Sequence, residues 1–525
     1  MKRRTFLQRT TAAATVPVLL GGFPVQVLGK NNSLLALSQN AAINDRVLVL
    51  VQLNGGNDGL NTVLPLDQYT NLSAVRSNVL IPDNQALLVG TDTGLHPAMQ
   101  GIKQLWDDQK LGILQSVGYP EPNFSHFRST DIWHTGSPSD EVWESGWLGR
   151  YLELQHSGFP IGYPNDDFPD PLAITIGSIV STTCQGMTTN LGMAIGDPSS
   201  FNPLLTGGTD VLPNSNYGTE LGFLRQSMEQ TNQYLQVIQA ADSAGSNQSA
   251  LYDQNPSRLA EQLKIVARLI KGGLQTKIYV VSIGGFDTHA NQVDQSDPLL
   301  GAHTNLLTQV STAIEAFQDD LELLGLEERV IGMTYSEFGR RIQSNSAFGT
   351  DHGAAAPMFV FGTNVNPMLH GSNPIIPAMV DVKDSLPMQF DFRSVYGSIL
   401  ADWFCVDESV VQGLLYDGFQ KIPVLNASCE LTSNEAPIVL SDMLGQSFPN
   451  PADGVIRIPF QSTGGRVIMQ LFDSTGKLIH TIVDQDYAPG EHELEMDTRK
   501  LAAGTYVYRM QHQDQTASKM LSVIR

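Results

Sequence analysis

The sequence predicts an α/β domain, built on a mostly parallel sheet with helices on both faces, followed by a small antiparallel β-sandwich. Continuous apolar, β-branched runs end in loops rich in glycine, and helical patterns lie between them. After about residue 425 the pattern changes to short alternating segments separated by turn signals, which is typical of a β-sandwich. A chain of 525 residues is too long for one compact core, so we expect at least two domains.

The composition is that of a large, acidic, globular protein. The chain carries 31 basic and 53 acidic residues, a formal net charge of −22, and 41% of its residues are hydrophobic. Such an acidic surface repels phosphate backbones and anionic lipid, which argues against nucleic-acid partners and against membrane docking. Three cysteines, Cys184, Cys405 and Cys429, exclude a disulfide scaffold and a cysteine-rich zinc module. One disulfide is possible, and Cys405 with Cys429 is the closer pair in sequence.

The first 29 residues have the features of a signal peptide. A basic start is followed by a short apolar run that proline and glycine interrupt. The run does not predict a transmembrane helix, and no later stretch is long and apolar enough to span a bilayer. Adjacent Arg3 and Arg4 resemble a twin-arginine signal, for which an ordinary signal peptide is the alternative. Both interpretations predict that the mature protein leaves the cytoplasm.

Four apolar runs predict buried strands of the sheet, at residues 46–52, 277–283, 329–335 and 358–361. Helical periodicity predicts five helices, at residues 97–109, 218–241, 256–271, 302–324 and 392–404. Ligands of such sheets bind beyond the carboxyl ends of the strands. We therefore expect functional residues in the loops that follow the four runs.

Six alternating segments predict the strands of the C-terminal sandwich, at residues 455–459, 466–472, 478–483, 492–496, 504–510 and 517–523. The domain organisation predicted from these patterns has four parts. They are a signal peptide over residues 1–29, an α/β domain over 45–425, a linker over 426–441 and the β-sandwich over 442–525.

Three motifs mark the C-terminal segment: Pro449-Asn-Pro-Ala, Leu471-Phe-Asp-Ser-Thr-Gly-Lys and Leu501-Ala-Ala-Gly-Thr-Tyr-Val-Tyr. With them, residues 449–525 resemble the type A sorting domain of the type IX secretion system of Bacteroidota. The resemblance implies a transport tag that the secretion machinery reads at the outer membrane, with a cargo that passes the periplasm and is then secreted or attached to the cell surface. The alternative is a carbohydrate-binding or adhesive sandwich, which the absence of tryptophan from this segment weakens.

Further motifs mark the body of the chain: Val51-Gln-Leu-Asn-Gly-Gly-Asn-Asp-Gly, Ser125-His-Phe-Arg-Ser-Thr-Asp, Phe286-Asp-Thr-His, Ser336-Glu-Phe-Gly-Arg-Arg and Gly349-Thr-Asp-His-Gly. With them, residues 45–424 resemble the family called domain of unknown function 1501. That family's fold is similar to that of the alkaline phosphatase and sulfatase superfamily, and its members are often exported by the twin-arginine route. The resemblance implies an alkaline-phosphatase-like domain and a metal-dependent hydrolase of phosphate or sulfate esters, although the family's activity is not settled.

The resemblance implies one metal site at Asp287, His289 and His352. A carboxylate with imidazoles is a ligand set suited to a divalent cation such as zinc, iron or manganese. The alternative is that these polar groups only form hydrogen bonds with loop backbone.

A second metal site is incomplete in this sequence. Asn54 stands where the superfamily has an aspartate, and Phe338 stands where it has a histidine. Glu337 is a remaining candidate ligand, and Asp58 or Asp351 are candidates from nearby loops. Fewer anionic ligands lower the affinity for a second dication, so we expect an altered or single metal centre.

The candidate catalytic residues are Ser125, His126, Arg128 and Arg340. His126 falls at the superfamily's nucleophile position, so either it or the neighbouring Ser125 is a candidate nucleophile, and His126 is also a candidate base. The alternative is that both cap a helix. The two arginines are candidates for bidentate binding of a small anionic substrate, or they pair with carboxylates of the chain.

Two functions follow for this exported protein. The leading hypothesis is a metal-dependent ester hydrolase with an altered metal centre, which Asp287, His289 and His352 favour. The rival is a non-catalytic cell-surface or secreted binding scaffold on the same fold, which Asn54 and Phe338 favour. Fold resemblance alone does not establish activity.

Overall fold

The structure of the protein is a computed structural model. It describes residues 45–198, 216–429 and 444–523, with gaps at 157–158, 161, 188, 428, 446, 449, 451, 453, 474–477, 503 and 513–514. It also describes two short strands, β1 (Val18–Leu20) and β2 (Phe23–Val25). The predicted twin-arginine pair and most of the predicted linker lie outside the described residues. The predicted domain boundaries stay predictions.

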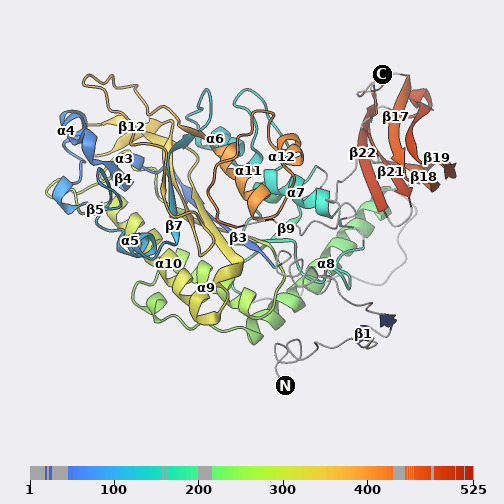
Figure 1. Cartoon of the computed structure of the whole chain (residues 1–525), viewed down its shortest axis with the longest axis horizontal. Coiled ribbons are helices and arrows are strands. Elements are labelled where there is room, and N and C mark those ends of the chain that lie inside the picture. Colours follow the sequence, from blue (N-terminus) through green and yellow to red (C-terminus); the bar gives the residue numbers. More distant parts are fainter. Residues whose placement is uncertain are drawn as a thin grey trace, which may run out of the picture.

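A nine-stranded sheet forms the centre of the α/β domain (Figure 1). Its strands are β3 (Val47–Asn54), β7 (Leu111–Gly118), β8 (Ala173–Ile176), β9 (Gly192–Ile195), β10 (Ile278–Gly284), β11 (Val330–Tyr335), β14 (Ala356–Phe361), β15 (Leu369–His370) and β16 (Phe390–Asp391). The order is β15-β7-β14-β11-β3-β10-β8-β9, with β16 beside β7. Only the two ladders of β14 are antiparallel in this described sheet, so the predicted mostly parallel sheet is confirmed.

The four apolar runs are found as β3, β10, β11 and β14. The sequence pattern did not predict β7, although all eight of its residues are buried. Its sequence, Leu-Gly-Ile-Leu-Gln-Ser-Val-Gly, mixes glycine and polar residues with the apolar ones. Strand β7 is therefore buried on both faces by its neighbours in the tertiary structure, although its sequence is not an unbroken apolar run.

Helices cover both faces of the sheet (Figure 1). One face carries α5 (Gln100–Asp107), α9 (Arg258–Lys271) and α10 (Ala302–Leu324), and the other carries α6 (His126–Thr135), α7 (Trp147–Gln155), α11 (Phe392–Asp402) and α12 (Glu408–Leu414). Strand β3 supplies both cores, because successive side chains of a strand point to opposite faces. Val49 and Val51 lie in the first core, and Leu48 and Leu50 lie in the second.

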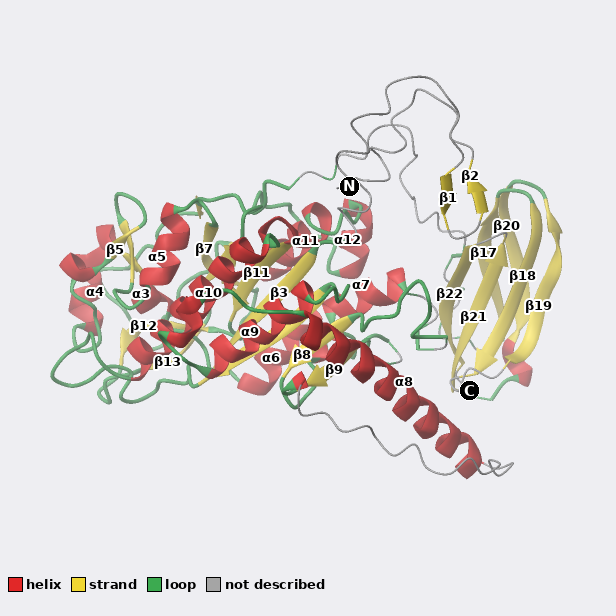
Figure 2. Cartoon of the chain, turned by 90° about the horizontal axis from the view of Figure 1, so that it is seen from below, coloured by secondary structure: helices red, strands yellow, loops and turns green. Residues whose placement is uncertain are grey.

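All five predicted helices are present, and α10 has the predicted bounds. Helix α8 (Asn216–Ala244) is the long helix that extends from the domain in Figure 2, and it contacts α9. The hydroxyl of Ser257 accepts a hydrogen bond from the Ala260 amide and so caps the start of α9. Smaller elements border the domain: α3 (Gly59–Thr62), α4 (Tyr69–Arg76), β4 (Val63–Pro65), β5 (Leu87–Leu88), β6 (Thr93–Leu95), β12 (Gly339–Ser344) and β13 (Thr350–Gly353).

The C-terminal segment consists of antiparallel strands (Figure 2). Strand β17 (Val455–Ser462) pairs with β20 (Gly490–Asp497), and a second sheet has the order β19 (Leu478–Tyr487), β18 (Gly465–Asp473), β21 (Gly504–His512) and β22 (Gln515–Val523). Ile458, Phe460, Met469 and Tyr508 belong to a core of its own. The predicted small antiparallel module is confirmed.

Cys405 and Cys429 form a disulfide with their Cα atoms 5.5 Å apart, and Cys184 is a buried free thiol. The disulfide therefore joins the end of α11 to the start of the predicted linker. Among the described helices, none combines the length and the apolar character needed to cross a membrane.

Candidate metal centre

Three loops meet at the carboxyl edge of the sheet. They follow the adjacent parallel strands β11, β3 and β10 and comprise residues 336–338, 55–56 and 286–289. The Gly55 amide donates a hydrogen bond to Glu337 Oε1 at 2.8 Å, and the Phe286 amide donates one to the Asn54 carbonyl at 3.0 Å. The loop after β3 therefore ties its two neighbours together, at the edge where ligands bind in such sheets.

Two glycines allow this close approach. Gly55 has φ +124°, and a Cβ atom there would lie 2.2 Å from the Asp287 nitrogen. Gly56 has φ +81°, and its Cβ would lie 2.2 Å from the ring of Phe338. Only glycine combines these backbone angles with the absence of a side chain.

Two further elements bring side chains to this edge. Strands β12 and β13 form a hairpin in which Arg340 pairs with His352, so the hairpin carries Asp351 and His352. Helix α6 begins at His126, directly after its N-cap residue Ser125. Residues from positions 55 to 352 are thus assembled by five different elements.

Four side chains form what we call the His–Asp cluster: His126, Asp287, His289 and His352. Asp287 Oδ1 lies 3.1 Å from His352 Nε2 and 3.2 Å from His289 Nε2. Asp287 Oδ2 lies 3.4 Å from His126 Nε2, and the Nε2 atoms of His289 and His352 are 2.9 Å apart. Ligand atoms of His126, Asp287 and His352 all lie within 4.8 Å of one another, a spacing that can hold a metal ion.

The hydrogen bonds on the far side of two rings test whether a cation fits. His289 Nδ1 lies 2.9 Å from Asp351 Oδ1, and His352 Nδ1 lies 2.8 Å from the Phe124 carbonyl oxygen. Neither a carboxylate nor a carbonyl can donate, so both Nδ1 atoms carry the hydrogen. In the Nδ1–H tautomer, the Nε2 atom of each ring presents a lone pair toward the other ring and toward Asp287. A bound cation would relieve this repulsion, and the donor set suits zinc, iron or manganese.

The pKa values of the cluster also suit a cation. Burial raises the pKa of Asp287, but the hydrogen bond and the positive charge of Arg340 oppose this effect, and the pKa is lowered to about 2. Burial likewise opposes the effect of His289 on Asp351, whose pKa is lowered overall. Burial lowers the pKa of His352 even though Asp287 raises it. At neutral pH the two carboxylates are therefore ionised and the His352 ring is neutral.

Arg340 supports the loops rather than facing solvent, since it is only 1% exposed. Its Nε donates to the Gly56 carbonyl at 2.6 Å and its Nη1 to the Thr350 carbonyl at 2.8 Å. Its Nη2 donates to the Phe286 carbonyl at 2.8 Å and to Asp287 Oδ1 at 2.9 Å. The guanidinium is therefore committed to the protein and does not face a substrate anion.

Arg128 has the same character at the start of α6. It forms an ion pair with Asp131, and its Nη2 donates to Ser137 Oγ at 3.2 Å and to the Pro138 carbonyl at 2.9 Å. These contacts fasten the loop after α6. The sequence left two roles open for Arg128 and Arg340, binding of a substrate anion or pairing with groups of the chain. In the structure, both guanidinium groups donate hydrogen bonds to groups of the chain.

Asp58 and Ser125 lie outside the His–Asp cluster. The Asp58 carboxylate is fully buried, ion-paired with Arg76, and accepts a hydrogen bond from Gln292 Nε2 at 2.6 Å. Ser125 is exposed, and its side chain makes no capping hydrogen bond to α6. The structure therefore brings together Asp287, His289, His352 and His126, with Asp351 behind them, and leaves Asp58 apart.

Glu337 and Phe338 occupy the side of the edge next to β11. Glu337 is 2% exposed, and its Oε1 lies 2.9 Å from His126 Nδ1. The buried ring of Phe338 packs against His352 and His126, with ring centroids 4.3 Å and 5.0 Å away. The contact of His352 with the Phe124 carbonyl could not be predicted from the sequence, because every residue has a backbone oxygen and the residue type does not show which one forms a contact.

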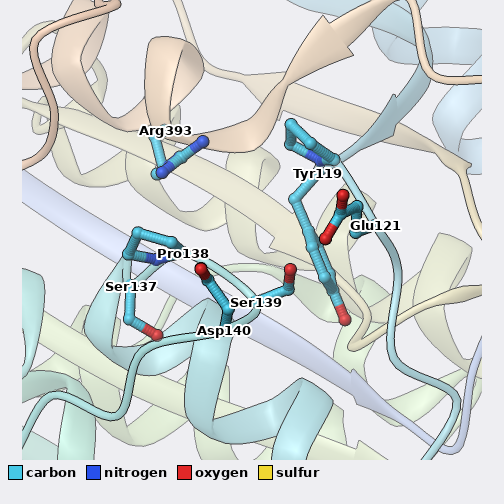
Figure 3. Close-up of a pocket in the computed structure, with 8 residues that line it drawn as sticks. Tyr119, Glu121, Ser137, Pro138, Ser139, Asp140 and Arg393 are labelled. Carbon is cyan, nitrogen blue, oxygen red and sulfur yellow. The ribbon is translucent and has the colours of Figure 1, made fainter.

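A pocket of about 260 Å³ lies beside α6 (Figure 3). Tyr119 and Glu121 line one side and Ser139 and Asp140 another, with Arg393 near them. Arg393 forms an ion pair with Asp391, outside the pocket lining, at 2.7 Å. The loop that supplies Tyr119 and Glu121 continues to Phe124 and to the His–Asp cluster.

Three solved structures illustrate what the chain is similar to. The Pseudoalteromonas sp. sulfatase PsFucS1 is 10% identical, with 89% of this chain and 88% of that chain covered and a TM-score of 0.35. A Vibrio parahaemolyticus protein of the alkaline phosphatase superfamily is 11% identical, with 86% and 79% covered and a TM-score of 0.30. Dimeric latent PorU from Porphyromonas gingivalis is 18% identical, with 15% and 9% covered and a TM-score of 0.14. Such scores carry no argument about activity. No curated protein matches the chain.

Two family models match the chain. The model of a secretion system C-terminal sorting domain matches residues 446–524 and indicates secretion or attachment to the cell surface, with the type IX secretion machinery as partner. The model described as a protein of unknown function (DUF1501) matches residues 214–384, which include Asp287, His289, Glu337 and His352. Both resemblances seen in the sequence are thus confirmed, the first as a match of residues 214–384 to the DUF1501 model and the second as a match of residues 446–524 to the sorting-domain model.

Proposed function

We propose that the α/β domain is a metal-dependent hydrolase of phosphate or sulfate esters that acts after export through the twin-arginine and type IX machineries. The observation that carries the proposal is the convergence of three imidazole Nε2 atoms on the Asp287 carboxylate. Asp287, His289, His352 and His126 would hold one divalent cation, with zinc, iron or manganese as the candidates. When bound, such a cation supplies Lewis acidity toward an ester oxygen.

The residues next to β11 support a single cation rather than two. Phe338 has no ligand atom, and its ring is buried against His352. Glu337 already accepts hydrogen bonds from the Gly55 amide and from His126, and Asp58 is paired with Arg76. Among the described residues, no second set of free carboxylates and imidazoles remains at this edge.

Ser125 is the proposed nucleophile by elimination among the described hydroxyls near the cluster. Thr288 and Thr350 are buried and donate to Gln292, and Ser336 donates to the Leu53 carbonyl. Ser129 is buried and donates to the Glu337 carbonyl. Ser125 is exposed and directly precedes His126 of the cluster, and its hydroxyl makes no capping hydrogen bond to α6.

A non-catalytic binding scaffold is the second candidate function. Its support is that both candidate substrate arginines are committed to the chain, Arg128 to Asp131 and loop carbonyls and Arg340 to the loops of the site. A binding protein needs no free guanidinium at the cluster. This candidate keeps the same fold and the same surface location.

Metal content of the mature, folded protein tests the proposal. We expect about one equivalent of zinc, iron or manganese per chain, lost in the His289→Ala/His352→Ala variant. His480→Ala is the matched control, because His480 is exposed on β19 and should leave the metal in place. Turnover of aryl sulfates and aryl phosphates is then measured with and without Ser125→Ala. Absence of metal after reloading would exclude the metal-centred mechanism, and metal without turnover would favour the scaffold.

A further inference from the structure

Glu337 is a buried acid, and its hydrogen bonds connect it to two other elements at the edge of the sheet. It is 2% exposed, and a single oxygen, Oε1, receives the Gly55 amide at 2.8 Å and lies 2.9 Å from His126 Nδ1. Its other oxygen lies 3.4 Å from the hydroxyl of Ser336. Burial of a carboxylate is costly unless hydrogen bonds satisfy it, and here they come from two separate elements of the chain.

The backbone of Glu337 holds the same helix that its side chain contacts. The Ser129 hydroxyl of α6 donates to the Glu337 carbonyl at 2.8 Å, one turn after His126. Glu337 therefore fixes the first turn of α6 at two points. The ring of Phe338 adds an apolar surface against His126, at a centroid distance of 5.0 Å.

The geometry argues against Glu337 as a metal ligand. Both close contacts of Glu337 Oε1, with the Gly55 amide and with His126 Nδ1, are to groups of the chain, and no cluster atom other than His126 Nδ1 is within hydrogen-bonding distance of it. It contacts His126 through Nδ1, the ring nitrogen that faces away from Asp287, while His126 Nε2 lies 3.4 Å from Asp287 Oδ2. Oε1 already accepts the hydrogen of the Gly55 amide, so it acts as an acceptor here and the hydrogen of the contact with the ring belongs to His126 Nδ1.

We propose that Glu337 is a positioning residue, whose carboxylate holds His126 as the Nδ1–H tautomer and so directs the Nε2 lone pair at Asp287. This inference deepens the proposed metal centre and rests on it for its purpose. Asp351 and the Phe124 carbonyl act in the same way on His289 and His352. All three rings then present Nε2 to the Asp287 carboxylate, His289 and His352 to Oδ1 and His126 to Oδ2, and outer hydrogen bonds orient metal-binding histidines in this way.

Ring-nitrogen NMR on metal-free protein tests the positioning directly. The mature chain is labelled with ¹⁵N-histidine, and His126→Asn identifies the signal among the 11 histidines. We expect the Nδ1–H tautomer for His126 in the wild type and in Glu337→Gln, since the amide oxygen of glutamine can accept both hydrogen bonds. Glu337→Ala removes the acceptor, so the Nε2–H tautomer should appear. This readout requires neither bound metal nor turnover.

Metal affinity gives the second readout, measured by competition with a chelator. Loss of an outer partner of a metal-bound histidine weakens binding about 10- to 100-fold, which we expect for Glu337→Ala, with recovery in Glu337→Gln. Asp320→Asn is the matched control, because Asp320 is a buried carboxylate that accepts from backbone amides near residue 248, away from the cluster. The control should alter neither the tautomer nor the affinity.

Three results would overturn the inference. One is an Nε2–H tautomer of His126 in the wild type, and another is an unchanged tautomer in Glu337→Ala. The third is a loss of affinity in Glu337→Gln as large as that in Glu337→Ala, which would make Glu337 a ligand. If Glu337→Ala does not fold, Glu337→Asp replaces it, because the shorter side chain withdraws the acceptor from the ring. A folded protein with the expected tautomer but no metal would reject the proposed function and leave the positioning role intact.

Discussion

Two loops flank the glycines after β3, and they differ in exposure and in chemistry. The loop after β10 presents Asp287 and His289 with side chains 46% and 43% exposed. The loop after β11 holds Glu337 with a side chain 3% exposed and Phe338 at 1%. Superfamily resemblance assigned metal ligands to both loops, yet only the first offers open lone pairs. The exposed loop after β10 can therefore bind a ligand, whereas the buried loop after β11 orients His126 and packs against its neighbours.

The largest effect expected concerns the exposed loop. Asp287→Asn should weaken metal binding by more than about 100-fold, because it removes the charge on which the three Nε2 atoms converge, whereas loss of an outer partner costs about 10- to 100-fold. Asp351→Asn removes only the charge behind His289 and should fall within or below that smaller range. Chelator competition measures both. Equal losses in the two variants would contradict the central position of Asp287.

The buried loop should respond in stability rather than in metal binding. Phe338→Ala empties a fully buried site and should lower the free energy of unfolding by about 3–5 kcal/mol. Phe338→Leu keeps most of the volume and should cost less than about 1.5 kcal/mol. Denaturant unfolding measures both. A Phe338→Ala protein that unfolds normally but loses its metal would reverse the contrast between the two loops.

The glycine loop joins both sides, so a methyl group there should disturb both. Gly55→Ala places a Cβ 2.2 Å from the Asp287 nitrogen at φ +124°, and we expect a loss of about 3 kcal/mol in unfolding free energy. Gly196→Ala is the control, because nothing lies within 4 Å of its added Cβ. Thermal unfolding compares the two variants. Equal melting temperatures would show that the loops are less tightly joined than the distances indicate.

The smallest effect concerns pH and the histidine behind β11. Burial lowers the pKa of His134 to about 4, and its Nε2 lies 3.1 Å from the Tyr335 hydroxyl at the end of that strand. A histidine whose pKa is lower in the folded than in the unfolded state, where it is about 6.5, binds its proton more tightly when the protein is unfolded. Protonation at low pH therefore favours unfolding. The contribution of His134 to stability should therefore fall as the pH drops from about 6.5 toward 4, by about 2 kcal/mol between pH 7 and 5.

The variant His134→Gln should reduce this slope, whatever its own stability at pH 7. Unfolding free energies at pH 7, 6 and 5 provide the comparison. Asp287, with a pKa of about 2, titrates below this window and does not contribute to it. An unchanged slope in the variant would assign the acid sensitivity to other groups.

Local patterns predicted most of the fold. The runs that became β3, β10 and β11 were visible because strands buried on both faces are apolar throughout. Strand β7 was not visible, because glycine and polar residues within it are buried only by the contacts of the folded domain. Asp287, His289 and His352 were named from family motifs, and the structure places them within hydrogen-bonding distance of one another.

The sequence by itself determined the sheet type, the helices and the placement of polar residues after the strands, because these depend on periodicity within short segments. Only the tertiary structure decided which polar groups remain open. Gly55 and Glu337 meet across 282 residues, and Arg340 donates to the carbonyls of Gly56 and Phe286 in two distant loops as well as to that of Thr350 in its own hairpin. Hydrogen-bond satisfaction and burial arise from such long-range contacts, so no local pattern could show that Arg340 and Asp58 are committed while Asp287 stays exposed.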